Sequence, residues 1–266
     1  MNKILLFCGS KDSGKTSAAK FVAGYFLNRA GVIKEFAQDF DGNLDVQIRI
    51  QSLDGTDKFS SEFAQLDLRR TDNEFIWFAE KNIWPYVKLY AFADELKSVT
   101  HQIFGLDVNL MYGNNEDKET LTYIKWEHIA KLLPKITTIS NVKEQEYMTI
   151  REFLQIFGTD ICRTILNDCW IDACFRNIIY ENSELAIIDD GRFMNEIYRS
   201  KQLGAKVIKL ERKLHIDNHK SENDLDQISK NNFDYIIDNT NMTLSEKNQA
   251  IFQALKNFGW VAGNLI

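Results

Sequence analysis

The segment Gly9-Ser10-Lys11-Asp12-Ser13-Gly14-Lys15-Thr16 decides the fold, because it matches the pattern G-x-x-x-x-G-K-[ST]. The continuous apolar run 4–8 precedes it, as expected for a strand that is buried on both faces of a parallel sheet. Residues 15–28 follow, with apolar side chains at helical spacing. Glycines let such a loop curl its N–H groups around phosphate oxygens, and the helix N-terminus adds partial positive charge. The sequence therefore predicts a phosphate-binding loop between a first strand and a first helix.

Two side chains of this loop have distinct expected roles. Lys15 is expected to reach the β- and γ-phosphates of a nucleoside triphosphate, and Thr16 to place its hydroxyl on Mg²⁺. The alternative is an ordinary glycine-containing turn, which would not require a buried strand before it and an amphipathic helix after it.

Composition narrows the class of protein. The chain has 266 residues, of which 44% are apolar and 26% are charged, so it can bury a sizeable core and is neither disordered nor fibrous. Its 32 Lys and Arg against 38 Asp and Glu give a net charge of −6. Proteins that grip long stretches of nucleic acid are usually basic, so we expect no stable nucleic-acid binding.

The cysteines and the hydropathy point to the cytoplasm. Four cysteines occur without C-x-x-C or zinc spacing, which favours reduced thiols in an intracellular protein: Cys8, Cys162, Cys169 and Cys174. No apolar stretch reaches the roughly 18 residues of a membrane span, and the N-terminus is too short for a signal peptide. We therefore expect a cytoplasmic protein with no membrane partner.

Short apolar runs alternate with amphipathic stretches along the chain, which is typical of βαβ units. Further strands are predicted at 86–92, 185–189, 206–211 and 235–238, and further helices at 94–104, 150–157, 168–180, 195–203 and 243–258. Capping boxes begin two of these helices, at Thr149 with Glu152 and at Thr243 with Glu246. We predict one α/β domain over 1–266, with a mostly parallel five-stranded sheet and helices on both faces.

Two regions break the alternation. Region 36–85 contains Asp41-Gly42 and Asp54-Gly55 around the alternating Val46, Ile48 and Ile50, which predicts a small inserted β-hairpin. Asp39-Phe40-Asp41-Gly42 also matches D-x-x-G, but a hairpin turn explains it better, and no N-K-x-D motif supports a GTPase. Region 212–232 is polar and long for a connection, which favours a lid.

The chemistry of the acceptor separates the kinases that share this loop. An alcohol acceptor needs a carboxylate base, whereas a nucleoside monophosphate is mostly dianionic at pH 7 and needs cations instead. Cations near the predicted strand ends and loops are candidates, although each alone could be a solvated surface charge: Lys11, Lys97, Arg151, Arg163, Arg192 and Arg212.

Asp189-Asp190-Gly191-Arg192 is the strongest of these positions, because it follows the predicted strand 185–189. A carboxylate at the carboxyl end of a strand beside the phosphate-binding strand can hold Mg²⁺ or its waters, so Asp190 is a candidate metal ligand and Arg192 a candidate phosphate clamp. The alternative for Asp190 is a helix N-cap, and both roles can coexist.

These residues, with several further runs, resemble those of a known protein family. The chain resembles the deoxynucleoside monophosphate kinases encoded by bacteriophages, over most of its length and most weakly in 36–85. Besides the phosphate-binding loop, the resemblance is carried by the runs FADELK (92–97), REFLQIFGTD (151–160), DCW (168–170), DGRFMNE (190–196) and HKSE (219–222). Similar proteins often have Val at the position of Gly191 and Pro at that of Met194, and we expect the glycine to loosen the turn while keeping Asp190 and Arg192 in place.

The resemblance implies a phosphate-loop kinase fold in which ATP, with Mg²⁺, phosphorylates a deoxynucleoside monophosphate to the diphosphate. Implied catalytic residues are Lys15, Asp190 and Arg192, and implied metal ligands are Thr16 and Asp190. Implied ATP-binding residues are Gly9, Lys11, Asp12, Ser13, Gly14, Lys15, Thr16, Ser17, Arg212 and Asn239. Implied acceptor-binding residues are Asp94, Lys97, Arg151, Trp170, Arg192 and Glu196.

The resemblance also implies that 212–232 closes over the nucleotides and carries His219 and Glu222, for which a salt bridge within a polar loop is an equal alternative. Trp170 could stack on a base, although a tryptophan in an amphipathic helix is more often part of the core.

Two rival functions stay open. A kinase of the same fold could act on a hydroxyl acceptor such as a hydroxymethyl pyrimidine in DNA, and the chain could be a nucleotide-binding regulator without turnover. The sequence leaves open the preferred base, the choice between ribose and deoxyribose, and the formation of a homodimer.

Overall fold

A computed structural model describes residues 2–51, 57–60, 62–129, 146–212 and 228–265. The chain forms two compact units, one of Met1–Ala91 with Asn177–Ile266 and the other of Phe92–Arg176. The description of 1–266 as one domain stays a prediction.

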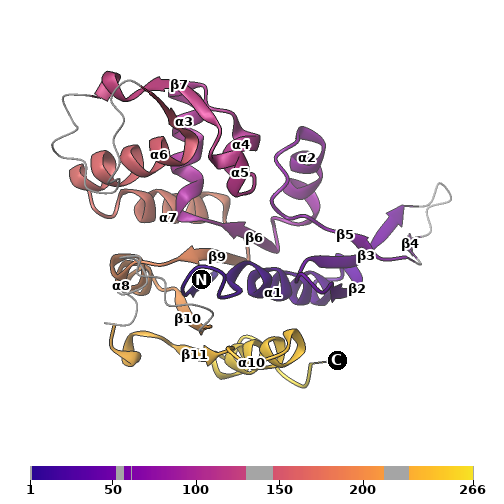
Figure 1. Ribbon diagram of the computed structural model, residues 1–266. Helices are drawn as coiled ribbons and strands as arrows, with labels where there is room; N and C mark the ends of the chain where they lie inside the picture. The colour runs from indigo at the N-terminus through magenta and orange to yellow at the C-terminus, as the bar shows by residue number, and fades with distance from the viewer. Residues whose placement is uncertain (1, 52–56, 61, 130–145, 213–227, 266) are drawn as a thin grey trace. The chain divides into compact units, whose positions relative to one another are not determined.

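The first unit is built on a parallel sheet of five strands in the order β11-β10-β1-β9-β6 (Figure 1). The strands are β1 (Lys3–Cys8), β6 (Val87–Tyr90), β9 (Leu185–Gly191), β10 (Lys206–Glu211) and β11 (Tyr235–Asp238). This confirms the predicted fold class. Because all five strands run in the same direction, the loops that follow them leave from one edge of the sheet, where ligands bind in such folds.

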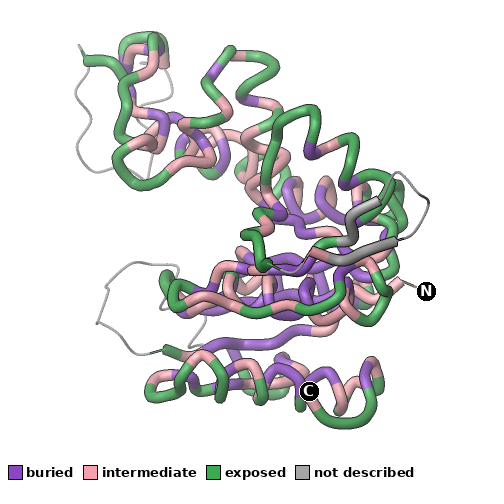
Figure 2. The backbone as a smooth tube through the Cα atoms, turned by 90° about the vertical axis from the view of Figure 1, so that its right-hand side faces the viewer, coloured by how far each residue is buried: buried purple, intermediate pink, exposed green. Residues whose placement is uncertain are grey.

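Helices cover both faces of this sheet. Among the described residues, the helices that lie wholly in this unit are α1 (Lys15–Arg29), α2 (Asn73–Asn82), α8 (Met194–Gln202) and α10 (Leu244–Asn257), with a short 3₁₀ helix η4 (Lys230–Asn232). Leu5 and Phe7 of β1 are fully buried in a core that includes residues of α1 and α10. Leu6 and Cys8 alternate to the opposite face, where α8 packs against β1 and β10. The central strands are accordingly buried along most of their length (Figure 2).

Small antiparallel strands occupy the region in which a hairpin was predicted. They are β2 (Ile33–Gln38), β3 (Leu44–Gln51), β4 (Asp57–Phe59) and β5 (Ala64–Gln65). The β2–β3 turn is closed by Asp39, whose Oδ1 accepts the Asn43 N–H at 2.7 Å, so the D-x-x-G match is a hairpin turn. The hairpin starts at Ile33, three residues before the predicted region. Gly55 and its neighbours lie outside the described residues.

Helix α2 lies inside this region and was not predicted. Asp72 caps it by accepting the Phe75 N–H, and Phe75 and Ala79 are its buried residues. In the sequence its apolar residues form one unbroken run, 75–79, instead of recurring at helical spacing, so the periodicity does not indicate a helix.

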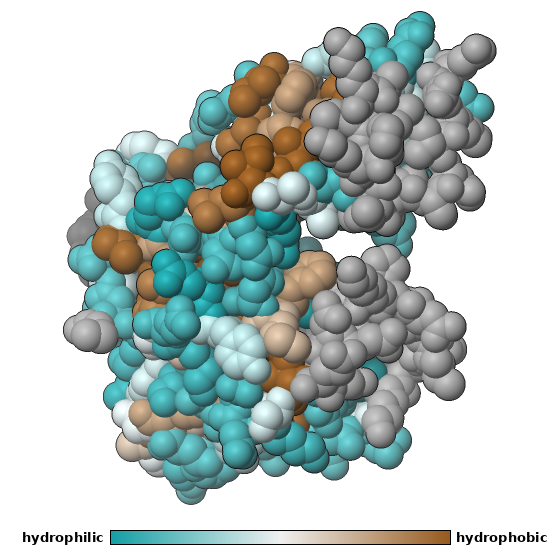
Figure 3. Space-filling model, turned by 90° about the vertical axis from the view of Figure 1, so that its left-hand side faces the viewer, coloured by the Kyte–Doolittle hydropathy of each residue, from teal (hydrophilic) through white to brown (hydrophobic). Residues whose placement is uncertain are grey.

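The second unit is mainly helical around a small core. Its elements are α3 (Phe92–Phe104), α4 (Val108–Tyr112), α5 (Asn115–Lys118), β7 (Leu121–Lys125), η1 (Trp126–Ile129), β8 (Tyr147–Thr149), α6 (Ile150–Gln155), η3 (Ile156–Arg163) and the first part of α7 (Cys169–Glu181). Trp126, Met111 and Met148 are fully buried at its centre. Large apolar side chains also remain exposed, among them Ile103 and Ile165, and hydrophobic surface is visible in the upper part of Figure 3.

The capping box at Thr149 is confirmed, because the Thr149 and Glu152 side chains each accept the other residue's N–H. The helix it opens does not end at Phe157. The chain continues as a π-helix over Ile156–Arg163. The wider turns of this helix keep the chain helical past Gly158.

Residues 213–227, which form most of the predicted lid and include His219 and Glu222, lie outside the described residues. Within the described ranges, no helix combines the length and the apolar character that crossing a membrane requires.

Candidate active site

The loop 9–16 adopts a backbone that depends on its glycines. Gly9 and Gly14 have φ angles of 155° and 89°. A Cβ at Gly9 would lie only 2.5 Å from the Leu210 carbonyl oxygen, so no larger residue fits there without displacing β10. Lys11 and Asp12 are exposed, and Asp12 itself has a φ of 60°. The chain therefore curls directly after β1 and enters α1 at Lys15.

Lys15 lies within this curl. Its Nζ donates to the carbonyl oxygens of Gly9 at 2.9 Å and Ser10 at 2.6 Å, and approaches Ser13 Oγ at 3.4 Å. Burial, together with the positive charge of Arg192, lowers the pKa of Lys15 to about 8, while nearby acidic groups such as Asp190 oppose the shift. A desolvated ammonium held by neutral carbonyls is well placed to exchange them for phosphate oxygens.

Asp190 and Arg192 lie at the end of β9, which pairs with β1. The strand runs to Gly191, so the prediction that it ends at Asp189 was wrong, and Asp190 is not the N-cap of α8. That position belongs to Phe193. Asp190 is half-buried and Arg192 is exposed. Both act on the pKa of Lys15, which Arg192 lowers and Asp190 raises. Strand pairing thus brings the loop lysine, a carboxylate and a guanidinium to the same edge of the sheet.

Glu196 holds the backbone of this segment. Its Oε2 accepts the N–H groups of Arg192 at 2.8 Å and Phe193 at 3.0 Å, and the residue is 2% exposed. Such burial favours a role in positioning Arg192 over the predicted contact with the acceptor nucleotide.

Gly191 is explained by the close approach of β9 to β1. A Cβ at this position would lie 2.9 Å from Leu6 Cδ1 and 3.1 Å from the Phe7 carbonyl oxygen. Its own carbonyl accepts the Gly9 N–H at 3.2 Å. The expectation that Gly191 loosens a turn was therefore wrong, because the residue belongs to a strand and allows a tight contact with the start of the loop.

Arg69 is a site residue that the sequence did not indicate. Its Nη2 lies 2.5 Å from Asp189 Oδ1 and 3.3 Å from the Tyr90 carbonyl oxygen. Asp189 is buried, and its Oδ2 has no hydrogen-bond partner among the described residues. Arg69 comes from a region without regular pattern and is 120 positions from its partner, so no local signal could have found it.

Two further side chains reach the loop from the C-terminal part of the unit. Asn239, which follows β11, donates from Nδ2 to the Ser13 carbonyl oxygen at 3.0 Å. Lys247 of α10 donates to Ser17 Oγ at 2.8 Å and was not predicted. Arg212 is exposed and close enough to lower the pKa of Lys247. Of the predicted ATP-binding residues outside the loop, Asn239 touches it directly.

The predicted acceptor residues Asp94, Lys97, Arg151 and Trp170 belong to the second unit. Asp94 Oδ1 accepts a hydrogen bond from the Tyr112 hydroxyl at 2.9 Å, and Lys97 Nζ lies 3.7 Å from the centre of the Tyr112 ring. Tyr112 therefore joins the two residues, and it was not predicted because nothing in its local sequence distinguishes it.

Arg151 and Trp170 are held by other partners. Arg151 Nε lies 2.5 Å from Glu119 Oε1, and its Nη2 donates to Asn115 Oδ1 at 3.0 Å. Trp170 is buried, and its Nε1 donates to the Gly158 carbonyl oxygen at 3.0 Å. This burial favours the core alternative for Trp170 over stacking on a base.

The comparison with known proteins decides the family. Residues 87–250 match the family model described as "Deoxynucleotide monophosphate kinase", which is more than half of the chain. The chain belongs to the deoxynucleotide monophosphate kinase family. It is also similar to a protein of Acanthamoeba polyphaga mimivirus named "Putative deoxynucleotide monophosphate kinase", with 28% identity over 181 residues, which are 63% of this chain and 82% of the viral protein.

Membership of this family gives the activity. The chain is an ATP-dependent phosphotransferase that acts on deoxynucleoside monophosphates, and its substrates are nucleotides. The matched region contains β9 with Asp190 and Arg192, but it begins after the loop 9–16. The loop and the matched region meet through the pairing of β1 with β9.

The oxygen donors at this edge are of the kinds that bind Mg²⁺. Mg²⁺ is commonly bound by one or two carboxylates together with phosphates and water, rather than by a cage of protein ligands. Thr16 offers an exposed hydroxyl and Asp190 a half-buried carboxylate. Asp189 adds the buried Oδ2 that has no partner in the described parts of the chain. Where the structure describes the chain, no group of three His, Cys, Asp or Glu side chains forms a protein-only metal site.

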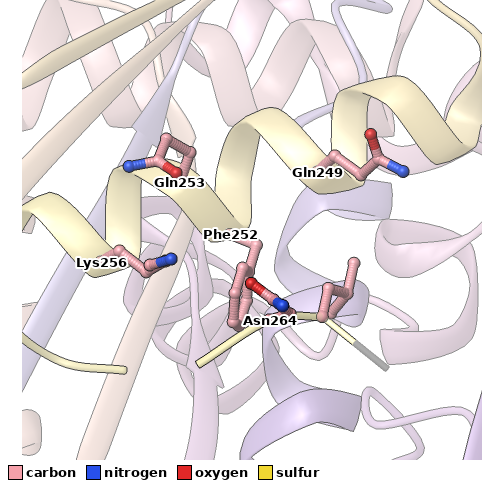
Figure 4. A pocket seen from close by; sticks show the side chains of 6 residues that line it. Gln249, Phe252, Gln253, Lys256 and Asn264 are labelled. Atoms are coloured by element: carbon pink, nitrogen blue, oxygen red, sulfur yellow. The ribbon is translucent and has the colours of Figure 1, made fainter. Parts of the chain in front are cut away.

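A separate pocket of this kinase lies along α10 and the C-terminal segment (Figure 4). It is lined by Gln249, Phe252, Gln253, Lys256, Asn264 and Leu265. None of these residues belongs to the candidate site, and Lys256 is the only charged one among them.

Proposed function

We propose that Lys15, Asp190 and Arg192 carry out the family's reaction in this chain, transferring the γ-phosphoryl group of Mg²⁺-bound ATP to a deoxynucleoside 5'-monophosphate. The observation that carries the proposal is the position of Lys15, which is buried within the loop while its charge is influenced by Arg192 and Asp190.

The proposed reaction needs no general base. An oxygen of the acceptor phosphate, already mostly dianionic at pH 7, attacks the γ-phosphorus, and the bond to the β,γ-bridging oxygen breaks to release ADP. Lys15 leaves the carbonyls of Gly9 and Ser10 and binds the β- and γ-phosphates, while Arg192 binds phosphate oxygens. Both cations act by neutralising charge on the phosphoryl group as it is transferred.

Thr16 and Asp190 are the proposed ligands of the magnesium ion, which when bound would neutralise the β- and γ-phosphates. Asp189, which precedes Asp190 in β9, is held in its orientation by an ion pair with Arg69. Glu196 supports the same segment by holding the backbone at Arg192.

The acceptor nucleotide is proposed to contact Asp94, Lys97 and Arg151, because an anionic acceptor requires cations and the second unit supplies two of them. Trp170, being buried, would support this region rather than stack on a base. We further propose that residues 212–232 form a lid, which includes His219 and Glu222.

A survey of acceptors tests this function. The protein is mixed with ATP, Mg²⁺ and each of dAMP, dCMP, dGMP, dTMP and their ribose forms, and ADP release is recorded. We expect turnover with at least one deoxynucleoside monophosphate, and its loss in Lys15→Ala. ATP binding without turnover on any of them would favour the regulator.

Duplex DNA containing hydroxymethyl pyrimidine is the second arm of the survey. The net charge of −6 opposes close approach to DNA, so we propose that the acceptors are free nucleotides in the cytoplasm. Turnover on the DNA alone would support the rival hydroxyl kinase.

A further inference from the structure

Lys247 of α10 is a buried lysine whose ammonium group contacts Ser17 at the start of α1. The residue is 6% exposed, and its Nζ donates to the Ser17 hydroxyl at 2.8 Å. Within the described ranges, no carboxylate forms an ion pair with it. An ammonium group has three donors, and a single neutral acceptor leaves most of its hydrogen bonding and all of its charge without compensation.

The position of Lys247 places this charge on the phosphate-binding loop. Helix α10 packs beside α1 (Figure 1), and Ser17 belongs to the first turn of α1. A carbon placed at the Cβ position of Gly14 would lie 3.4 Å from Lys247 Nζ. The ammonium therefore lies against the residue that directly precedes Lys15.

Asn239 provides a second, independent observation at the same place. It is 5% exposed, its Nδ2 lies 3.8 Å from the same Cβ position, and it donates to the Ser13 carbonyl oxygen. Its Oδ1 is buried without a partner in the described parts of the chain. The ends of β11 and α10 thus bring two incompletely satisfied polar side chains to one side of the loop.

The electrostatic environment of Lys247 points to an anionic ligand. Burial lowers the pKa of Lys247 to about 8, and the positive charge of Arg212 contributes to the shift. Two cations next to each other, one of them buried, destabilise the nucleotide-free protein. The arrangement becomes favourable once an anion is bound beside them.

We propose that Lys247 is a further ATP-binding residue, which binds the phosphate chain of the nucleotide at the Gly14–Ser17 side of the loop. This inference rests on the proposed binding of ATP by the loop. It gives α10 a direct part in binding the donor nucleotide, a role that no sequence motif indicated. Arg212 and Asn239 are the neighbours of Lys247 at this place.

The rival explanation is that Lys247 only ties α10 to α1 through Ser17. Two variants separate the explanations. Lys247→Gln keeps a side chain that can donate to Ser17 Oγ but removes the charge, whereas Lys247→Arg keeps the charge. Lys256→Met, on the same helix but outside the site, is the matched control, and Lys15→Ala reports on the loop itself.

The measurement is the dissociation constant for ATP and for inorganic tripolyphosphate, with the melting temperature of each nucleotide-free variant. We expect Lys247→Gln to weaken the binding of both ligands about tenfold or more, since a charge-assisted hydrogen bond to the phosphates is lost. The melting temperature of the nucleotide-free variant should not fall. Lys247→Arg should stay within a few-fold of the wild type and Lys256→Met should be unchanged.

An ATP affinity of Lys247→Gln within twofold of the wild type would overturn the inference, because the tie to Ser17 would then be the whole role. If Lys15→Ala still abolishes ATP binding in that case, the proposed function stands without the inference about Lys247. Failure of the wild-type protein to bind ATP would instead contradict the proposed function.

Discussion

At the scale of single residues, the site is a set of charges that the protein leaves incompletely compensated. Lys15 is held by carbonyl oxygens and a hydroxyl rather than by a carboxylate, and the Arg192 guanidinium forms no ion pair within the described ranges. Charges of this kind weaken the fold unless a ligand of opposite sign binds. Their removal should therefore affect activity more than stability.

Lys15→Ala is the direct test of this argument. We expect kcat to fall by about a thousandfold, because the lysine supplies phosphate charge in the transition state. The melting temperature should not fall, because a desolvated ammonium is removed. The control is Lys20→Ala in the same helix, whose Nζ donates to Asn43 Oδ1 instead. Activity within a few-fold of the wild type would exclude the proposed role of the loop.

Arg192 permits a comparison of charge with shape. Arg192→Ala should reduce kcat/KM more than Arg192→Lys, because a planar guanidinium binds a phosphate through two hydrogen bonds and an ammonium does not, while the lysine still keeps the charge. Steady-state kinetics with ATP and the acceptor varied in turn measures both variants. Equal losses would leave the proposed clamp without support.

At the scale of elements, the site depends on how closely β9 approaches β1. Gly191→Val adds a branched side chain where even a Cβ would lie 3.1 Å from the Phe7 carbonyl oxygen and from Cys8 Cβ. We expect a loss of about 1–3 kcal/mol in the free energy of unfolding. ATP affinity should also fall, because the hydrogen bond from Gly9 N–H to the Gly191 carbonyl oxygen links the β1–β9 contact to the phosphate-binding loop.

Urea unfolding and ATP titration of Gly191→Val, beside the smaller change Gly191→Ala, test this prediction. Alanine should lie between glycine and valine in both measurements. A valine variant as stable and as tight for ATP as the wild type would mean that β9 has room to move away from β1.

The success of sequence reasoning also differs between elements. The strands and helices that flank the loop, and the capping box at Thr149, were predicted because their signals lie within a few adjacent residues. Arg69 and Lys247 were not, since their partners lie 120 and 230 positions away along the chain. A single lysine in an amphipathic helix has the same local pattern whether it faces water or a binding loop. Pairing of distant segments, which no local pattern reports, completes the site.

At the scale of the whole molecule, the buried lysines make stability depend on pH. The pKa of Lys247 is lowered from 10.5 to about 8 by burial and by Arg212. Between these values the unfolded chain binds more protons than the folded chain, so this residue's contribution to the free energy of unfolding rises with pH. Lys15 contributes in the same direction, whereas Cys8, whose pKa burial raises from 9.0 to about 12, contributes in the opposite direction above pH 9.

Comparing the wild type with Lys247→Met isolates one of these terms, because Lys15 and Cys8 are common to both proteins. Below pH 8 the nucleotide-free variant should be the more stable, by up to about 3 kcal/mol, since methionine fills the same space without a buried charge. The difference should shrink from pH 8 toward pH 10.5, as the wild-type lysine loses its proton. Urea unfolding at several pH values in this window measures it. A difference independent of pH would mean that the pKa of Lys247 is the same in the folded and the unfolded chain. At pH 7, saturating ATP should narrow the difference by about 1.4 kcal/mol for each tenfold by which the wild type binds ATP more tightly, because the bound phosphates favour the charged lysine.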